Sequence, residues 1–180
     1  MEKQIVTTSA APHVLLDISG DLSLKGQDSF EVVVKSDNPD NLVLEAQDDQ
    51  VTIRCPGDCT VRVPRAAIIQ VASAHGDAVL KALDGDVTID ATDGDLELRN
   101  VGPTKVGKVN GDFEAKNVEG DLNIDSAQGD VSIRGVQGDF TVTNRISGNL
   151  NLSDVGGSAK AYANGNIILH LDPAPGHLNE

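Results

Sequence analysis

The sequence predicts an all-β protein, a parallel β-solenoid that coils one strand after another around a narrow apolar interior. A glycine returns about every nine residues between Gly76 and Gly165, and an Asp usually follows it. Apolar residues stand at the second, fourth and seventh places after the glycine, as Leu96, Leu98 and Val101 do. The first two alternate as in a strand, and the third lies past a change of direction. Each nine-residue unit is therefore predicted to form one strand and one corner.

Residues 1–70 are predicted to form strands with a less regular beat. Gly, Asp, Asn and Pro separate five strand-like runs, at residues 13–18, 30–35, 42–45, 51–54 and 60–63. Residues 20–24 already match the repeat unit. Because no low-complexity linker precedes residue 71, we expect an irregular N-terminal β segment, continuous with the solenoid, rather than a separate domain.

Residues 71–172 are predicted to form the nine-residue-repeat solenoid. Each repeat glycine is expected to turn the chain at a corner through a positive φ. The corner glycines are Gly76, Gly85, Gly94, Gly111, Gly120, Gly129, Gly138, Gly148, Gly157 and Gly165, and Gly102 shares their spacing. Residues 173–180 form a C-terminal tail, in which Pro173 and Pro175 are expected to end the strand pairing because proline has no N–H to donate.

The fifth place after each glycine predicts how many units make one coil. Basic and non-basic residues alternate there from unit to unit as far as Arg134. Two units per coil, about eighteen residues, would stack the basic residues in one column on one face and place Asp90 and Asp125 on the other. The basic residues are Lys81, Arg99, Lys116 and Arg134. Three units per coil would scatter them. We therefore expect two units per coil. The expected fold is a single-stranded β-helix, of the right-handed form.

The same four basic residues are the candidate partner-binding site, as a strip that could receive an acidic partner. Their alternative interpretation is a solvated face, because Glu97 and Glu114 lie two residues before Arg99 and Lys116 and can neutralise them locally.

The repeated Asp residues suggest either calcium binding or backbone hydrogen bonding at the corners. Eighteen-residue coils would place Asp77, Asp95, Asp112 and Asp130 in one column and Asp86, Asp121 and Asp139 in another. Calcium-binding nonapeptide rolls carry more glycines per corner, with the carboxylate in the turn. Asn149 and Asn166 occupy the same place, and Asn keeps a hydrogen bond without the charge. We therefore expect backbone bonding and no bound metal or other cofactor.

Cys55 and Cys59 flank a three-residue loop between two predicted strands. A hairpin there could place the thiols opposite each other, which leaves a disulfide, a metal pair and buried thiols geometrically open. We favour two reduced structural cysteines, since two ligands are too few for a closed zinc site.

Catalysis is not supported by the sequence. His13, His75, His170 and His177 are isolated, and no Ser or Cys stands in a strained elbow motif. We also see no long loop insertions of the kind that build a cleft on sugar-cleaving β-helices. The chain is therefore predicted not to be an enzyme.

The net charge of −14 argues against nucleic acid and an anionic membrane surface as partners. The N-terminus lacks the basic and then apolar pattern of a secretory signal, and no apolar run approaches the length of a membrane span. We expect a cytoplasmic protein, or an extracellular one if the chain is a fragment.

Residues 60–64 (Thr-Val-Arg-Val-Pro) and 71–77 (Val-Ala-Ser-Ala-His-Gly-Asp), followed by the Gly-Asp array, resemble the bacterial DUF4097 "putative adhesin" family, also called toastrack domains. The resemblance covers nearly the whole chain and implies a single-stranded β-helix in envelope-stress signalling or adhesion, with no catalytic motif. Bactofilins, which stack β-helices end to end into filaments, are a second resemblance. We expect a non-catalytic interaction module with a protein partner; the alternative is a scaffold that self-associates through its solenoid ends.

Overall fold

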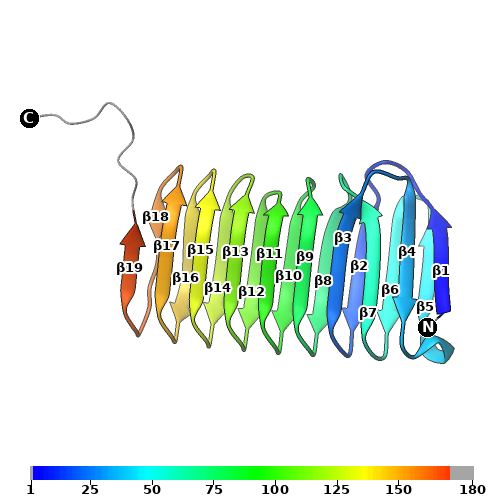
Figure 1. Cartoon of the computed structure of the whole chain (residues 1–180), viewed down its shortest axis with the longest axis horizontal. Helices are drawn as coiled ribbons and strands as arrows, with labels where there is room; N and C mark the ends of the chain where they lie inside the picture. Colours follow the sequence, from blue (N-terminus) through cyan, green and yellow to red (C-terminus); the bar gives the residue numbers. More distant parts are fainter. Residues whose placement is uncertain (1, 171–180) are drawn as a thin grey trace, which may run out of the picture.

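A computed structural model describes residues 2–170 and confirms the β-solenoid (Figure 1). Two sheets face each other, and each solenoid coil contributes one strand to each sheet. Sheet A contains, in spatial order, β1 (Glu2–Thr7), β4 (Glu31–Ser36), β7 (Cys59–Pro64), β3 (Leu22–Gln27), β9 (Ala78–Leu83), β11 (Leu96–Val101), β13 (Phe113–Val118), β15 (Val131–Val136), β17 (Leu150–Val155) and β19 (Ile167–His170). Sheet B contains β18 (Ala159–Lys160), β16 (Phe140–Ile146), β14 (Leu122–Ala127), β12 (Thr104–Val109), β10 (Val87–Thr92), β8 (Ile68–Ala74), β2 (His13–Ile18), β6 (Gln50–Cys55) and β5 (Val43–Gln47).

The strand register confirms two units per coil. Leu96 in β11 lies beside Ala78 in β9 and Phe113 in β13, all in parallel pairing. Residues at the same place in successive coils are separated by 17 to 19 positions. Sheet A therefore takes every second unit of the repeat, and sheet B takes the others.

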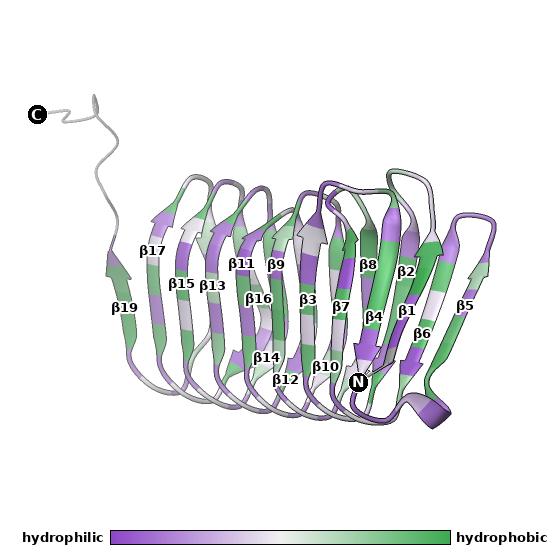
Figure 2. Cartoon of the chain, turned by 45° about the vertical axis from the view of Figure 1, so that its right-hand side comes forward, coloured by the Kyte–Doolittle hydropathy of each residue, from purple (hydrophilic) through white to green (hydrophobic). Residues whose placement is uncertain are grey.

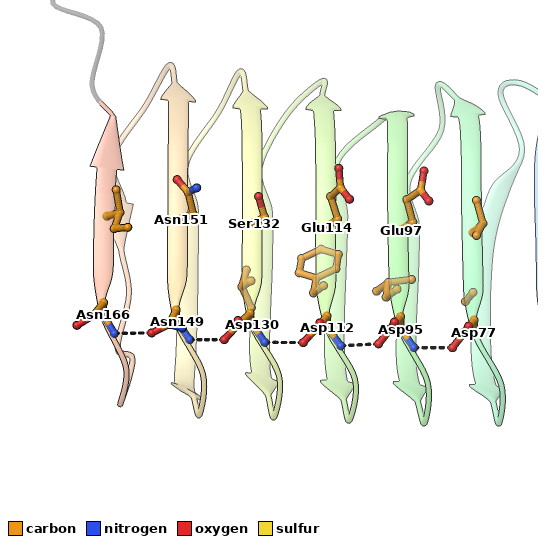
Figure 3. A pocket seen from close by; sticks show the side chains of 16 residues that line it. Asp77, Asp95, Glu97, Asp112, Glu114, Asp130, Ser132, Asn149, Asn151 and Asn166 are labelled. Atoms are coloured by element: carbon orange, nitrogen blue, oxygen red, sulfur yellow. Dashed lines mark hydrogen bonds between the residues drawn. The ribbon is translucent and has the colours of Figure 1, made fainter.

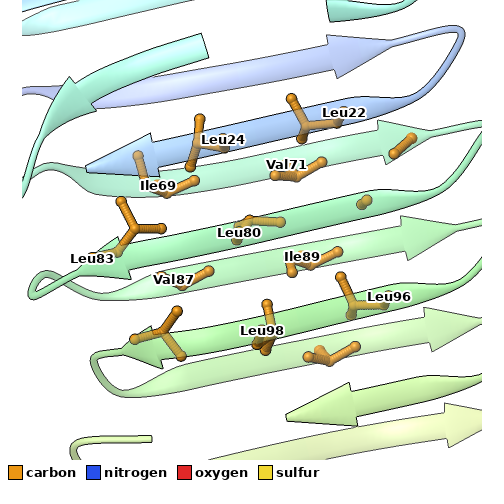
Figure 4. Close-up of a cluster of buried hydrophobic side chains, with 14 of the residues drawn as sticks. Leu22, Leu24, Ile69, Val71, Leu80, Leu83, Val87, Ile89, Leu96 and Leu98 are labelled. Carbon is orange, nitrogen blue, oxygen red and sulfur yellow. The ribbon is translucent and has the colours of Figure 1, made fainter. Parts of the chain in front are cut away.

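The core fills the narrow space between the two sheets. Alternate residues of each strand point inward, so Leu96 and Leu98 of β11 are buried together with Val87 and Ile89 of β10 (Figure 4). The inward residue at the seventh place, such as Val101, is buried at the corner. Because each coil is short, this interior is one continuous cluster of aliphatic side chains along the described solenoid.

The N-terminal segment differs from the predicted irregular cap, because most of it forms regular coils. The β2–β3 coil lies between the β6–β7 coil and the β8–β9 coil, so coils do not follow chain order there (Figure 1). β2 pairs in parallel with both β6 and β8, and β3 pairs in parallel with both β7 and β9. The five predicted strands are present, and residues 2–7 and 22–27 add β1 and β3.

The N-terminal end also departs from all-parallel pairing. β4 is antiparallel to β1 and β7, and β5 is antiparallel to β6. A hairpin turn through Asp48, which has a φ of 54°, joins β5 to β6. A 3₁₀ turn (Pro39–Asn41) precedes β5. Of these antiparallel pairs, only β5–β6 is a hairpin, because β4 neighbours β1 and β7, neither of which adjoins it in the chain.

The two ends of the solenoid differ in how they cover the core. At the N-terminal end the outermost strands, β1 and β5, pack the partly buried Val6 and Leu44 against the core, while Ile5 of β1 is 49% exposed. At the other end Ile167 and Leu169 of β19 are 46% and 50% exposed, whereas Leu150 and Leu152, one coil earlier, are 0% exposed. Figure 2 shows β19 as a largely apolar strand at this end. Residues 173–180, with the predicted tail and its prolines, lie outside the described residues.

Candidate interaction face on sheet A

Three columns of side chains run along the outer side of sheet A, one residue per coil. The Asp column consists of Asp58, Asp21, Asp77, Asp95, Asp112, Asp130, Asn149 and Asn166. The middle column consists of Thr60, Ser23, Val79, Glu97, Glu114, Ser132, Asn151 and Ile168. The cation column consists of Arg62, Lys25, Lys81, Arg99, Lys116 and Arg134.

The Asp column is a ladder of hydrogen bonds between coils (Figure 3). The backbone N–H of Asp95 donates to Oδ1 of Asp77 at 2.9 Å, and the backbone N–H of Asp112 donates to Oδ1 of Asp95 at 2.7 Å. Asn149 and Asn166 continue the same pattern. The predicted backbone bonding is therefore confirmed, but the donor belongs to the next coil rather than to the local turn.

The second predicted Asp column, at the corners that lead into sheet B, is shorter. The backbone N–H of Asp139 donates to Oδ1 of Asp121 at 2.9 Å, and the N–H of Ser158 donates to Asp139. Pro103 lies between Asp86 and Asp121 in this column and has no N–H to donate. In the described part of the chain, no three His, Cys, Asp or Glu side chains are grouped as metal ligands.

The corner glycines serve a different purpose from the one predicted. Among them, Gly120 alone has a φ in the left-handed region. Elsewhere the need for glycine is steric: a Cβ on Gly94 would lie 2.2 Å from Oδ1 of Asp77. The expectation of a positive φ was therefore wrong, because the glycine makes room for the carboxylate of the neighbouring coil.

The four predicted partner-binding residues stand side by side on successive strands. Lys81 lies beside Arg99, Arg99 beside Lys116, and Lys116 beside Arg134. The column continues through Lys25, which lies beside both Lys81 and Arg62. Lys25 and Arg62 were not predicted, although each stands five places after a glycine that precedes an Asp. Asp90 and Asp125 lie on β10 and β14 of sheet B, as predicted.

Carboxylates on sheet A hold part of the cation column in place. Glu97 contacts both Arg99 and, at 3.8 Å, Lys81. Glu114 lies 2.6 Å from Lys116, whose hydrogen bond lowers the pKa of the Glu114 carboxyl despite some desolvation. Arg134 lies 3.8 Å from Asp154. Within residues 2–170, no ion pair engages Lys25 or Arg62.

The outer side of sheet A has two hollows. One, of about 700 Å³, lies over the Asp and middle columns (Figure 3). The other, of about 550 Å³, lies beyond the cation column and is called the trough here; Asn100, Asn117 and Gly135 line it, together with Glu119 and Asp154.

The trough follows from the backbone at the sixth place of the units that form β11, β13, β15 and β17. Asn100, Asn117, Gly135 and Asp154 all have a positive φ there, between 51° and 79°, and so does Ala82. This conformation favours Gly, Asn and Asp, which are small. Nδ2 of Asn117 also donates to Oδ1 of Asn100 at 2.9 Å. These short side chains therefore leave a depression in the surface beside the cation column.

The two cysteines lie at a corner between sheets, not across a hairpin, because β6 and β7 belong to different sheets. Both are buried free thiols. The Cys55 thiol donates to Oγ of Ser36 at 3.2 Å. Burial, and secondarily Cys55, raises the pKa of the Cys59 thiol well above its usual range. A buried, protonated thiol is unreactive, which fits a structural role.

His75 is part of a surface cluster at a corner of sheet B. Its Nδ1 lies 2.7 Å from Oδ2 of Asp93, and Oδ1 of Asp93 accepts a bond from Nδ2 of Asn110. The bond to His75 is the main cause that lowers the pKa of Asp93; desolvation opposes it, and the bond from Asn110 adds to it. His13 lies on β2 and His170 on β19, while His177 is outside the described residues. The cluster links three successive coils.

In the part of the chain that the structure describes, no helix has the length and apolar character needed to cross a membrane.

Comparison with known proteins gives similarity to solved structures alone. No family model matches the chain, and no curated protein matches it. A putative adhesin from Parabacteroides distasonis is similar at 14% identity, with 94% of each chain covered and a TM-score of 0.36. A putative adhesin from Parabacteroides merdae is similar at 9% identity, with 94% of this chain and 95% of that chain covered and a TM-score of 0.30.

Proposed function

We propose that this protein is a non-catalytic interaction module that binds a partner protein on the outer side of sheet A. The cation column carries the proposal. It holds six of the fourteen Lys and Arg residues of a chain whose net charge is −14. Like charges directly beside each other on neighbouring strands are destabilising. A cost of this kind, repeated over six strands, favours a role in binding.

The ion pairs on this face do not cancel the column. Six cations stand beside two carboxylates of the middle column, Glu97 and Glu114. The paired side chains of the column are 42% to 73% exposed, and exposed pairs contribute only about 0–1 kcal/mol each. The carboxylates therefore orient the cations more than they neutralise them.

The backbone under the column is held on both sides, which favours binding without rearrangement. Every column strand pairs with a neighbour on each side, and the Asp ladder ties the coils together at the corner. A surface that is already ordered loses little conformational freedom on binding. The resemblance of the sequence to DUF4097 proteins favours envelope-stress signalling or adhesion as the setting for such a module.

The test compares two variants of the full chain, each lacking four cations. The column variant changes Lys81, Arg99, Lys116 and Arg134 to Ala, and the matched control changes Lys105, Lys108, Arg145 and Lys160 to Ala. Both are immobilised for pull-down from a bacterial lysate after thermal unfolding shows that each is folded. We expect proteins captured by the wild type to be lost by the column variant and kept by the control. Equal capture by the two variants would exclude the column as the site.

End-to-end association is a second candidate, favoured by the exposed Ile167 and Leu169 at the C-terminal end. The last two strands of the described chain, β18 and β19, contain no Asp or Glu. An unpaired strand edge with apolar side chains is prone to pair with another chain. Sedimentation over a range of concentrations tests it: association that Leu169→Asp abolishes supports it, and a monomer at every concentration removes it.

A further inference from the structure

We infer that the partner presents an α-helix with a single stripe of carboxylates, which lies along the solenoid axis over the cation column. This inference rests on the proposed function and names the class of partner. Three observations carry it: the spacing of the cations, the trough beside them, and the position of the remaining acidic groups.

The spacing of the column fits one turn of helix per coil. Neighbouring strands are about 4.8 Å apart, so the five steps between the six cations span about 24 Å. A helix advances about 5.4 Å per turn, so five turns span about 27 Å. With the helix centred on the column, the misfit at each end is about 1.5 Å, which the flexible stems of Lys and Arg can absorb.

An extended acidic peptide fits the column less well. Side chains on one side of a strand recur about every 6.8 Å, so five steps span about 34 Å and exceed the column by about 10 Å. Such a peptide would lose register within two or three coils. Duplex DNA is excluded on charge, because it carries one negative charge per about 1.7 Å and would lie against a chain of net charge −14.

The trough provides room for a rod-shaped partner. A helix is about 10 Å across with its side chains, wider than one column of residues. The trough lies beside three of the six cations, because Asn100 follows Arg99, Asn117 follows Lys116 and Gly135 follows Arg134 in sequence. A helix that lies over the cation column therefore also covers the trough, where these small residues leave room for it.

The carboxylates that remain on this face restrict the stripe to one side of the helix. Glu119 and Asp154 line the trough, and Glu97 and Glu114 stand on the opposite side of the column, with the Asp column beyond them. A helix acidic all round would meet these groups. The partner helix should therefore be acidic toward the column and uncharged or basic on its flanks, with Lys25 and Arg62 open to new ion pairs.

The experiment titrates the full chain with two labelled, alanine-rich peptides of about 24 residues, which is six to seven helical turns. Both contain the same residues, including six Glu. In the striped peptide the Glu residues alternate i+3 and i+4 spacing on one face; in the control peptide they are spread around the helix. Circular dichroism verifies equal helicity, and fluorescence anisotropy measures binding to the wild type and to the two four-cation variants.

We expect the striped peptide to bind at least about tenfold more tightly than the control peptide, a difference lost in the column variant and kept in its matched control. Equal binding of both peptides would overturn the helix inference, because the column would then attract any polyanion. If neither peptide binds but capture from lysate still depends on the column, the helix inference is wrong and the proposed function stands. If capture is also independent of the column, both fail.

Discussion

At the scale of single residues, the Gly-Asp pair works as one unit shared between two coils. The glycine of one coil leaves space for the carboxylate of the previous coil, and that carboxylate accepts the N–H of the Asp that follows the glycine. The sequence predicted the acceptor role from the residue type. It could not identify the donor, because the partner lies 17 to 19 residues away and its identity depends on the coil register.

Replacing one acceptor of the Asp column tests this role. Asp112→Ala removes the acceptor for the N–H of Asp130, and we expect a loss of about 1 kcal/mol in the free energy of unfolding. Asp112→Asn keeps the acceptor and removes one of the stacked charges, so its stability should equal or exceed that of the wild type. Urea unfolding measures both. If the two variants lose the same stability, the carboxylate does not act mainly as an acceptor.

The residues with a positive φ beside the cation column give a second test. Gly135 has a φ of 79°, and an L-residue with a Cβ costs about 1–2 kcal/mol in this region. We expect Gly135→Ala to lower the melting temperature, and Gly135→Asn to lower it much less, because Asn117 occupies the same place one coil earlier. A melting temperature for the Asn variant as low as for the Ala variant would contradict this account.

The His75–Asp93 contact predicts a pH dependence. The pKa of Asp93 is lowered in the folded state, so the contact stabilises the fold above the unfolded pKa of about 3.9 and is lost as the pH falls through the folded pKa. His75→Ala should raise the pKa of Asp93 toward its ordinary value, and His13→Ala should leave it unchanged. NMR titration of the Asp93 carboxyl measures both. An unchanged Asp93 titration in His75→Ala would remove His75 as the cause.

At the scale of elements, each strand is specified by a few inward side chains of matched size. β13 places Phe113 and Ala115 where β11 has Leu96 and Leu98, so a large and a small residue replace two of intermediate size. The sequence predicted these strands well because alternation and the nine-residue period are local signals. The sequence-based prediction made the segment before residue 70 too irregular, because the units there match the repeat although β4 and β5 interrupt their succession along the chain.

The element-scale prediction concerns β13. Phe113 is 1% exposed, and Phe113→Ala should cost about 3–5 kcal/mol through the cavity that it leaves. Glu114→Ala, on the outer side of the same strand, should cost less than about 1 kcal/mol. Denaturant unfolding of the two variants measures the difference. If both variants lost a similar free energy of unfolding, the expected cost of the cavity would be contradicted, and the side chains between the sheets would have to close around the space that Phe113 leaves.

At the scale of the whole molecule, coil order was the part of the fold beyond prediction from sequence. Every coil edge offers the same parallel pattern of N–H and C=O groups, so the local sequence of β2 does not determine whether β6 or β8 will lie beside it. For the same reason, only four of the six members of the cation column were predicted. Those four follow one another at intervals of one coil, whereas Lys25 and Arg62 join the column through strands that are stacked out of chain order.

The difference between the two ends predicts where the molecule opens. A solenoid is stabilised by contacts between neighbouring coils, so an end coil with an exposed interior is held least. We expect amides in β19 and β18 to exchange with solvent fastest, and amides in β9, β11 and β13 slowest. Hydrogen exchange followed by mass spectrometry measures this. Uniform protection along the described coils would show that the molecule opens as one unit.

The placement of the β2–β3 coil inside the stack has a mechanical consequence. Tension on the C-terminal end can detach β19 and then β17 singly, since each is then the last strand of sheet A. Tension on the N-terminal end detaches β1 and then reaches β2, which is hydrogen-bonded along both edges to β6 and β8. That strand has to slide out between two neighbours, with six residues breaking together. The solenoid should therefore resist pulling far better from its N-terminus than from its C-terminus.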